Sequence, residues 1–238
     1  MLLFIHCFNL FDKGEATVNL FEAVLTRRSI RAFRDITPEK TLIDDIIDAS
    51  RWTPSWGNTQ PWNVTVVQGE QLRRFKEEST KLAVSGAPSE PDVSMPEKWP
   101  PRYLERYRDV GRRTLSSLSI ERGDREGRNA FYLQMAELFG APVLVVVTIG
   151  RELSLEYAML DAGAFIQTLC LLAHEKGIGS CIMAAAVRYP GLMRELFNMS
   201  KNERIVAGVA LGYRDEENPV NTFERVRVDK DEIVRWVE

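Results

Sequence analysis

The segment EYAMLDAGAFIQTLCLLAHEKG, residues 156–177, is apolar on almost every side of a helix. A helix of this kind has no face suited to solvent, so it is expected at the centre of a fold. Gly177 supplies the residue type that most often ends a helix in the left-handed conformation. The remaining elements therefore have to surround one central helix.

Three segments have the composition of strands. APVLVVVTIG (141–150) is a continuous apolar run bounded by Pro and Gly, which is typical of a strand buried on both faces. RIVAGVALGY (204–213) predicts another core strand, and PWNVTVV (61–67) alternates and is rich in β-branched residues. With about four strands, roughly eight helices and no internal repeat or linker, residues 1–238 are expected to form a single α+β domain.

Two helices are expected before the first strand. Residues 18–27 predict a short amphipathic helix, whose apolar side chains are expected to point inward: Leu20, Phe21, Val24 and Leu25. TPEKTLIDDIIDASRW follows, with Thr37 as the N-cap and Pro38 at the first helical position. Pro54 stops this helix.

The middle of the chain is irregular in composition. A charged helix is expected over 70–83, and residues 86–101 then contain five prolines. Long irregular segments inside a compact domain are usually functional lids or mobile loops. Together with polar helices at about 101–119 and 125–139, residues 86–139 are expected to form an inserted flap. The tail DKDEIVRWVE predicts a short final helix.

The formal charge of −3 gives no general electrostatic reason to bind nucleic acid. Three cysteines without C-x-x-C spacing argue against a disulfide framework, and two distant histidines argue against a metal site. A reduced, cytoplasmic protein is expected. The apolar start, MLLFIHCFNLF, is too short to span a membrane and lacks a basic n-region. Residues 1–17 are thus expected to be a packing arm or a translated upstream stretch, in preference to a signal peptide.

The usual catalytic motifs are absent. There is no G-x-S-x-G elbow and no Walker loop, and GIGSCI (177–182) has Ile182 at the third glycine position of a dinucleotide fingerprint. This segment also follows a helix where the fingerprint requires a strand. If the protein is an enzyme, the reactive atom is expected to belong to a bound cofactor.

One basic cluster contains Arg27, Arg28, Arg31 and Arg34 around Ser29. Arginines near a helix C-terminus are explained by capping and a solvated face. Guanidinium groups with a hydroxyl between them also suit a phosphate monoester and a neighbouring polyol. A second pair, Arg225 and Arg227, lies near the other end of the chain, and spacing alone does not show whether the two clusters meet.

The uncharged loop WTPSWGNTQPWN, residues 52–63, carries three tryptophans. One interpretation is a proline-stabilised turn whose tryptophans fill the core. The other is a loop around a flat heteroaromatic ring with hydrogen-bonding edges, since exposed indoles and unpaired buried amides are both costly. Flavin mononucleotide (FMN) is such a ligand.

Four segments in this order resemble the FMN-dependent nitroreductase family over roughly residues 18–237. They are RRSIRAF, TPSWGNTQPWNVTVV, LDAGAFIQTLCLLAHEKGIGSCIMAAA and VAGVALGYRDEENPVNTFERVRVDKDEIVRW. WPPRYLERYRDVGRR and NPVNTFERVR are similar to the branch that includes nitrobenzoate reductases.

The resemblance implies a nitroreductase-like fold with a small mixed β-sheet covered by helices, in an interlocked homodimer with FMN at the subunit interface. C-terminal segments are expected to embrace the partner. It implies these cofactor-binding residues: Arg27, Arg28, Ser29, Arg31, Pro54, Ser55, Trp56, Asn58, Gln60, Met183, Ala184, Ala185, Arg225 and Arg227. The loop residues among them are expected to approach the flavin of the other subunit. Residues 183–185 are expected to pass backbone N–H groups along the flavin N5 edge.

Two departures from the family pattern bear on these residues. Trp56 stands where many relatives carry a small residue, and IMAAA (182–186) replaces versions that contain Pro and Gly. The implied activity is reduction of nitroaromatic or quinone-type acceptors by NAD(P)H, in two hydride transfers through the flavin. Reductive dehalogenation, flavin fragmentation, enoyl reduction and a non-catalytic flavin-binding dimer remain alternatives. No nucleotide motif distinguishes NADH from NADPH.

Overall fold

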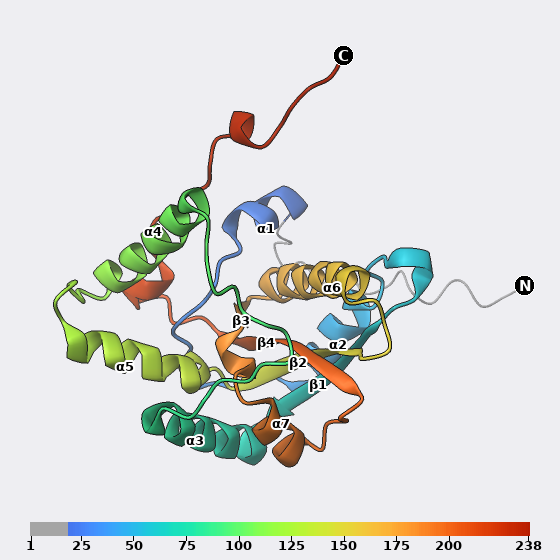
Figure 1. The fold of residues 1–238 in the computed structure, drawn as a ribbon, viewed down its shortest axis with the longest axis horizontal. Coiled ribbons are helices and arrows are strands. Elements are labelled where there is room, and N and C mark those ends of the chain that lie inside the picture. Colours follow the sequence, from blue (N-terminus) through green and yellow to red (C-terminus); the bar gives the residue numbers. More distant parts are fainter. Residues whose placement is uncertain (1–18) are drawn as a thin grey trace, which may run out of the picture.

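Four strands form one sheet in the order β1-β2-β4-β3 (Figure 1). Their bounds are β1 Trp62–Gln68, β2 Val143–Gly150, β3 Ile178–Met183 and β4 Glu203–Tyr213. The computed structural model describes residues 19–238, so the expectation for the arm 1–17 lies outside the described residues. Neighbouring strands pair antiparallel. The parallel component of the expected mixed sheet is limited to an isolated bridge between Ser29 and Ser180.

Strand β2 organises the core, because its side chains alternate between two hydrophobic clusters. Val143, Val145 and Val147 pack with α6 (Leu155–Glu175) and α2 (Lys40–Ser50) on one face of the sheet. Leu144 and Val146 pack on the other face, where α3 (Gly69–Ser85), α5 (Arg125–Ala136) and α7 (Pro190–Phe197) lie (Figure 1). Both faces of the strand are therefore buried, as its continuous apolar sequence predicts.

Helix α6 is the central helix, and Gly177 follows it with a φ of +72°, as expected. It is the one helix among residues 19–238 that is long and apolar enough to cross a membrane. In this fold it covers the sheet and packs against α2, which is the position of a core helix.

The segment GIGSCI forms strand β3, which the sequence pattern did not predict. Its position lets the arginine cluster reach the sheet, because the Ile30 N–H donates to the carbonyl of Ser180 at 2.9 Å. A Cβ atom at Gly179 would lie 2.8 Å from the Ile30 side chain. Glycine is therefore needed at this close approach.

Helix α1 (Leu20–Thr26) corrects the first expectation about helix faces. Its apolar side chains are exposed in the single chain, by 53 to 83%, at Leu20, Phe21, Val24 and Leu25. Only Ala23 is buried, because the helix meets the rest of the described chain along one narrow side on α6.

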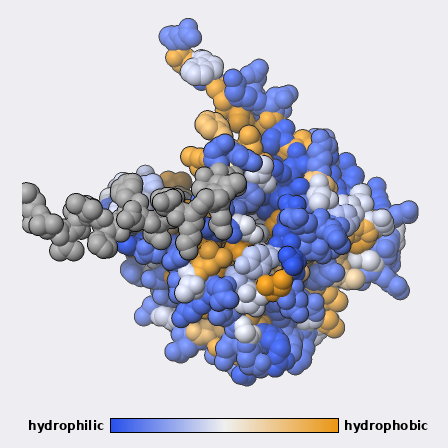
Figure 2. All heavy atoms as spheres, turned by 180° about the vertical axis from the view of Figure 1, so that it is seen from behind, coloured by the Kyte–Doolittle hydropathy of each residue, from blue (hydrophilic) through white to orange (hydrophobic). Residues whose placement is uncertain are grey.

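The expected start of α2 and the expected C-terminal helix are wrong. Helix α2 begins at Lys40, and Pro38 is buried ahead of it instead of occupying its first turn. In the tail, only a 3₁₀ turn forms, over Lys230–Glu232. The tail projects from the body with apolar side chains among polar ones (Figures 1 and 2), and Trp236 is 79% exposed. A short segment without a packing surface gains too little to stay helical.

Candidate functional site

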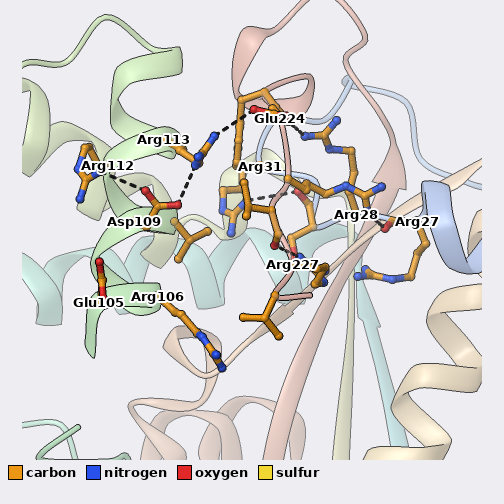
Figure 3. A pocket seen from close by; sticks show the side chains of 16 residues that line it. Arg27, Arg28, Arg31, Glu105, Arg106, Asp109, Arg112, Arg113, Glu224 and Arg227 are labelled. Atoms are coloured by element: carbon orange, nitrogen blue, oxygen red, sulfur yellow. Dashed lines mark hydrogen bonds and ion pairs between the residues drawn. The ribbon is translucent and has the colours of Figure 1, made fainter. Parts of the chain in front are cut away.

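A cavity of about 610 Å³ brings both arginine clusters together (Figure 3). It lies between the segment after α1, the C-terminal segment 223–228 and α4 (Pro101–Ser117). Its basic lining is Arg27, Arg28, Arg31, Arg106, Arg112, Arg113, Arg225 and Arg227, with Ser29 among them. The possibility that the two clusters form one site is therefore realised in the fold. Arg34, the last arginine of the first cluster, is exposed outside this lining.

Asn221 joins the two segments that carry these arginines. Its side chain is fully buried and accepts a hydrogen bond from the Arg31 N–H at 2.8 Å. Its amide group donates to the carbonyls of Ala32 and Asp215, both at 2.8 Å. One buried amide thus uses three of its four hydrogen-bonding positions to hold segment 31–32 against the C-terminal region.

Two arginines add further contacts between the same two regions, one from each side. Arg28 donates to the carbonyl of Phe223, and its guanidinium lies over the Phe223 ring at 5.4 Å from the centroid. Arg225 donates to the carbonyls of Leu25 and Arg27. Guanidinium groups at a helix C-terminus satisfy carbonyls that have no partner within the helix, and this is what Arg225 does for α1.

The wall formed by segments 27–31 and 225–227 carries unbalanced positive charge. Among residues 19–238, no carboxylate forms an ion pair with the five arginines of these segments. Burial lowers the pKa of Arg28, and the charges of Arg225, Arg214 and Arg31 lower it further. Burial also lowers the pKa of Arg225, together with the charges of Arg227 and Arg27. These cations repel one another, so this wall favours an anion.

Helix α4 forms the opposite wall, and its charges are mostly paired (Figure 3). Asp109 binds Arg113 at 2.7 Å and Arg112 at 3.1 Å. Three ion pairs connect α4 to the C-terminal part of the chain: Arg113 pairs with Glu224 at 3.3 Å, and Arg102 and Arg106 pair with Glu232 at 3.2 and 3.0 Å. One wall of the cavity therefore favours an anion, while the opposite wall is nearly neutral.

The backbone of the tryptophan loop, residues 52–63, is held by its own turns and by a contact with α6. Gly57, Asn58 and Gln60 all have positive φ, and the Gln60 N–H donates to the Ser55 hydroxyl at 2.9 Å. The N–H of Trp56 donates to both carboxylate oxygens of Asp161 on α6, at 3.2 Å each. Asp161 is only 6% exposed. A buried carboxylate thus fixes the position of this loop.

The indoles at the start of this loop do not fill the core of the chain, as one interpretation of its sequence would require. Trp52 is 75% exposed and Trp56 67% exposed. Trp56 stacks on Tyr157 with a centroid distance of 4.9 Å. Trp62, at the start of β1, instead packs on Phe165. The loop therefore presents Trp56 and the neighbouring Asn58 and Gln60 to its surroundings.

Within one chain, the loop and the arginine cavity lie near opposite ends of α6. Asp161 holds the loop, while His174 contacts Thr26, just before the arginines, at 2.8 Å. Thirteen residues of helix separate these anchors, which corresponds to about 20 Å. The expected site residues of the loop, Pro54 to Gln60, do not line the arginine cavity of the same chain.

Residues 183–185 follow directly from β3. Met183 is buried at the end of the strand, Ala184 is exposed, and a 3₁₀ turn begins at Ala185. The first N–H groups of such a turn have no acceptor within the turn. Because β3 also pairs with Ser29, the strand connects these N–H groups to the arginine segment.

The model of the nitroreductase family matches residues 24–213. The chain belongs to the nitroreductase family. It is 33% identical over 208 residues to 4-nitrobenzoate reductase of Pseudomonas putida, covering 87% of this chain and 91% of that protein. This likeness confirms the expected family, and it agrees with the resemblance to the nitrobenzoate reductase branch.

Two solved nitroreductases have the same fold. One is the FMN- and NADPH-dependent NfnB from Sphingopyxis sp. strain HMH, with a TM-score of 0.88, 32% identity and coverage of 92% of this chain and 98% of that chain. The other is FMN-dependent NfnB from Mycobacterium smegmatis in complex with NADPH. Its TM-score is 0.86, with 25% identity and coverage of 92% and 100%. The expected nitroreductase-like α+β fold is confirmed.

Sequence reasoning missed several residues of this nitroreductase site. Asn221 lay within the quoted segment NPVNTFERVR, and the only sequence signal for it was an amide directly before the second arginine pair. Asp161 is an acidic residue in a helix that is otherwise almost wholly apolar, which was a usable signal for a buried partner. The α4 arginines were expected only as part of a polar helix in the flap, and nothing in the sequence placed them at the cavity.

Proposed function

We propose that this nitroreductase is an FMN-dependent oxidoreductase that uses NAD(P)H to reduce nitroaromatic or quinone-type acceptors. The observation that carries the proposal is the convergence of Arg27, Arg31 and Arg227 beside Ser29 on one wall without paired carboxylates. Charge-assisted hydrogen bonds from guanidinium groups are the usual means of holding a phosphate monoester. The donor set therefore fits the phosphate end of FMN.

Residues 183–185 and the tryptophan loop are assigned to the ring end of the cofactor. The N–H groups at Ala184 and Ala185 are suited to stabilise negative charge that develops at a ring edge by donating hydrogen bonds to it, because they are fixed at the end of β3. The exposed side chains of Asn58 and Gln60 offer amide groups, and Trp56 offers a flat apolar face. These groups bind, orient and exclude water.

When bound, FMN would supply the redox chemistry, taking a hydride from NAD(P)H and returning the electrons to an acceptor in a second step. No side chain assigned to the site has to act as a nucleophile, in keeping with a protein that places ligands and balances charge. Similarity to the 4-nitrobenzoate reductase of P. putida and to the NADPH-bound NfnB supports this acceptor class and this reductant.

The working form is a homodimer in this proposal. The loop lies about 20 Å along α6 from the arginine segment, so it serves a cavity other than that of its own chain. The single chain also leaves many large apolar side chains exposed on α1, the loop, α6 and the tail: Leu20, Phe21, Val24, Leu25, Trp52, Trp56, Leu160, Trp236 and Val237. A second subunit would cover such a surface. The cytoplasmic location and the role of residues 86–139 as a flap also stay predictions.

Steady-state oxidation of NADH and NADPH with and without 4-nitrobenzoate or a quinone tests the function. The proposal predicts acceptor-dependent oxidation by the FMN-loaded dimer. A protein that binds FMN but oxidises neither nucleotide with any acceptor would be a non-catalytic flavin-binding dimer. Oxidation that occurs only with halogenated or enoyl acceptors would favour another flavin reaction on this fold.

A further inference from the structure

We propose that Arg28 and Arg225 position the phosphate site and do not themselves bind the phosphate, a division of labour that rests on the proposed function. Resemblance to the family assigns every arginine of both clusters to the cofactor alike. The structure separates them into two groups by what their guanidinium groups already contact. With Asn221, Arg28 and Arg225 form a clasp between segments 25–32 and 221–225.

Both terminal nitrogens of the Arg225 guanidinium already bind backbone carbonyls of the same chain. One terminal nitrogen donates to the Arg27 carbonyl and the other to the Leu25 carbonyl. Both acceptors lie at the end of α1, where carbonyls lack partners within the helix. A phosphate that took these two N–H groups would leave both carbonyls without their present donor, and the contact with the Arg27 carbonyl is partly buried.

Arg28 makes the reciprocal contact. It donates to the Phe223 carbonyl and covers the Phe223 ring, so it is held on two sides by the C-terminal segment. Arg28 thus crosses from the N-terminal segment to the C-terminal one, and Arg225 crosses back. Asn221, which is fully buried, accepts the Arg31 N–H and so holds the Arg31 backbone against the C-terminal region.

Among residues 19–238, the guanidinium groups of the remaining arginines form no hydrogen bond that crosses between the two segments. Arg31 makes one long contact with the Ser29 carbonyl at 3.4 Å, and Arg227 makes one with its neighbour Val226 at 2.8 Å. No side-chain hydrogen bond of Arg27 is found among residues 19–238. Each guanidinium has five N–H donors, so these three can still form the forked contacts that a phosphate accepts. The clasp then sets the distance between Arg27 or Arg31 on one segment and Arg227 on the other.

Lysine substitutions separate the two roles because they keep the charge. A lysine still attracts a phosphate as a point charge, whereas it cannot bridge two carbonyls with a rigid fork. Arg227→Lys is therefore expected to lower FMN affinity about threefold, because its charge remains beside the phosphate. Arg225→Lys is expected to lower it about tenfold or more, because losing the charged hydrogen bonds of Arg225 to the Arg27 and Leu25 carbonyls releases the clasp. Fluorescence quenching of the apoprotein titrated with FMN measures both values.

Hydrogen exchange of the FMN-free variants supplies the readout that a direct ligand would not change. Arg225→Lys is expected to speed amide exchange in residues 25–32 and 221–228 without FMN present, and Arg227→Lys is expected to leave it unchanged. Arg28→Lys should behave like Arg225→Lys in both measurements. The melting temperature and the oligomeric state of each variant are measured alongside, so that a globally unfolded variant is recognised and measured again at a temperature at which it is folded.

Two results would overturn the division of labour. One is Arg225→Lys retaining FMN affinity while Arg227→Lys loses it. The other is Arg225→Lys losing affinity while exchange in the two segments stays as in the wild type, which is the behaviour of a direct ligand. Failure of the proposed function is a different outcome: the wild-type protein would not bind FMN, while the exchange test of the clasp would still give its result.

Discussion

Arg225 donates a hydrogen bond to the carbonyl of Arg27, across a sequence separation of 198 residues. This contact makes one site from the two ends of the described chain. It explains why neither arginine cluster could be interpreted alone: each supplies one part of the same wall, and β3 holds the first part in place through Ile30.

Replacement of Arg27 or Arg227 by Gln is expected to weaken FMN binding by about 10- to 100-fold, since each change removes charged hydrogen bonds to the phosphate. Riboflavin, which has no phosphate, should bind the variants as it binds the wild type. Titration of the apoprotein with both ligands checks this. Arg34→Gln is the matched control, because Arg34 belongs to the same sequence cluster and lies outside the cavity. Equal losses for FMN and riboflavin would contradict the assignment.

Asp92 anchors the proline-rich segment 86–100, and its removal is expected to destabilise the fold by about 3 kcal/mol, because a poorly exposed Arg194 would lose its ion-pair partner. Asp92 pairs with Arg194 and with Arg151, and it also accepts the Ile205 N–H at 2.8 Å. Denaturant unfolding of Asp92→Ala measures the change. Asp48→Ala removes an exposed pair with Arg51 and should cost less than about 0.5 kcal/mol.

The same carboxylate predicts a pH dependence in acid. Burial raises the pKa of Asp92, but hydrogen bonds from Arg194, the Ile205 N–H and Arg151, with the charge of Arg194, more than offset this effect, so the net pKa is lowered. The folded-state pKa lies below the unfolded value of about 3.9, so this stabilisation is present at neutral pH and is lost as the pH falls below that value. Asp92→Ala should therefore show a shallower loss of stability below that pH than the wild type. Parallel curves would contradict the prediction.

His174 predicts a second pH dependence, at higher pH. Burial lowers its pKa, and the charges of Arg27, Arg214 and Arg225 lower it further. Its folded-state pKa is thus below the unfolded value of about 6.5, so the unfolded chain binds the proton more readily and stability falls as the pH drops below that value. His174→Gln should remove this part of the decline in apoprotein melting temperature. A wild-type curve that is flat just below pH 6.5, or a decline that persists in His174→Gln, would contradict it.

Asp161→Ala is expected to free the tryptophan loop, since the Trp56 N–H would lose both of its acceptors. Amide exchange over residues 54–60 should rise, and FMN affinity of the dimer should fall by about tenfold, comparable to the loss of one charged hydrogen bond. Asp161→Asn keeps one acceptor oxygen and is expected to lie between the wild type and Asp161→Ala. Unchanged exchange in the loop of Asp161→Ala would remove Asp161 from the site.

Elements that are determined by residues close together in the sequence were predicted correctly. The central helix, the doubly buried strand at Val143–Gly150 and the first strand at Trp62–Gln68 follow directly from apolar periodicity and β-branched content. Strand β3 was not predicted, because GIGSCI has no alternation of polar and apolar residues. The role of this strand depends on Ile30 lying against Gly179. The clasp of Arg28, Arg225 and Asn221 was not predicted, because its hydrogen-bond partners are backbone carbonyls and a backbone N–H group, which leave no trace in the sequence.

The exposed apolar face of α1 shows a second limit of prediction from the sequence. Periodicity correctly indicated that Leu20, Phe21 and Val24 share a helix, but it could not say which molecule covers them. In the single chain they are open to solvent, and the tail with Trp236 is too. Burial that comes from a second subunit is invisible to a pattern that describes one chain.

The absorption spectrum of the purified protein, with identification of any released chromophore, tests the central claim most directly. The account predicts a flavin spectrum and the release of about one FMN per chain, since each chain supplies one wall of arginines that form no ion pair within residues 19–238. A colourless protein that also fails to bind added FMN would contradict the assignment of Arg27, Arg31 and Arg227 to a phosphate, and with it the proposed function.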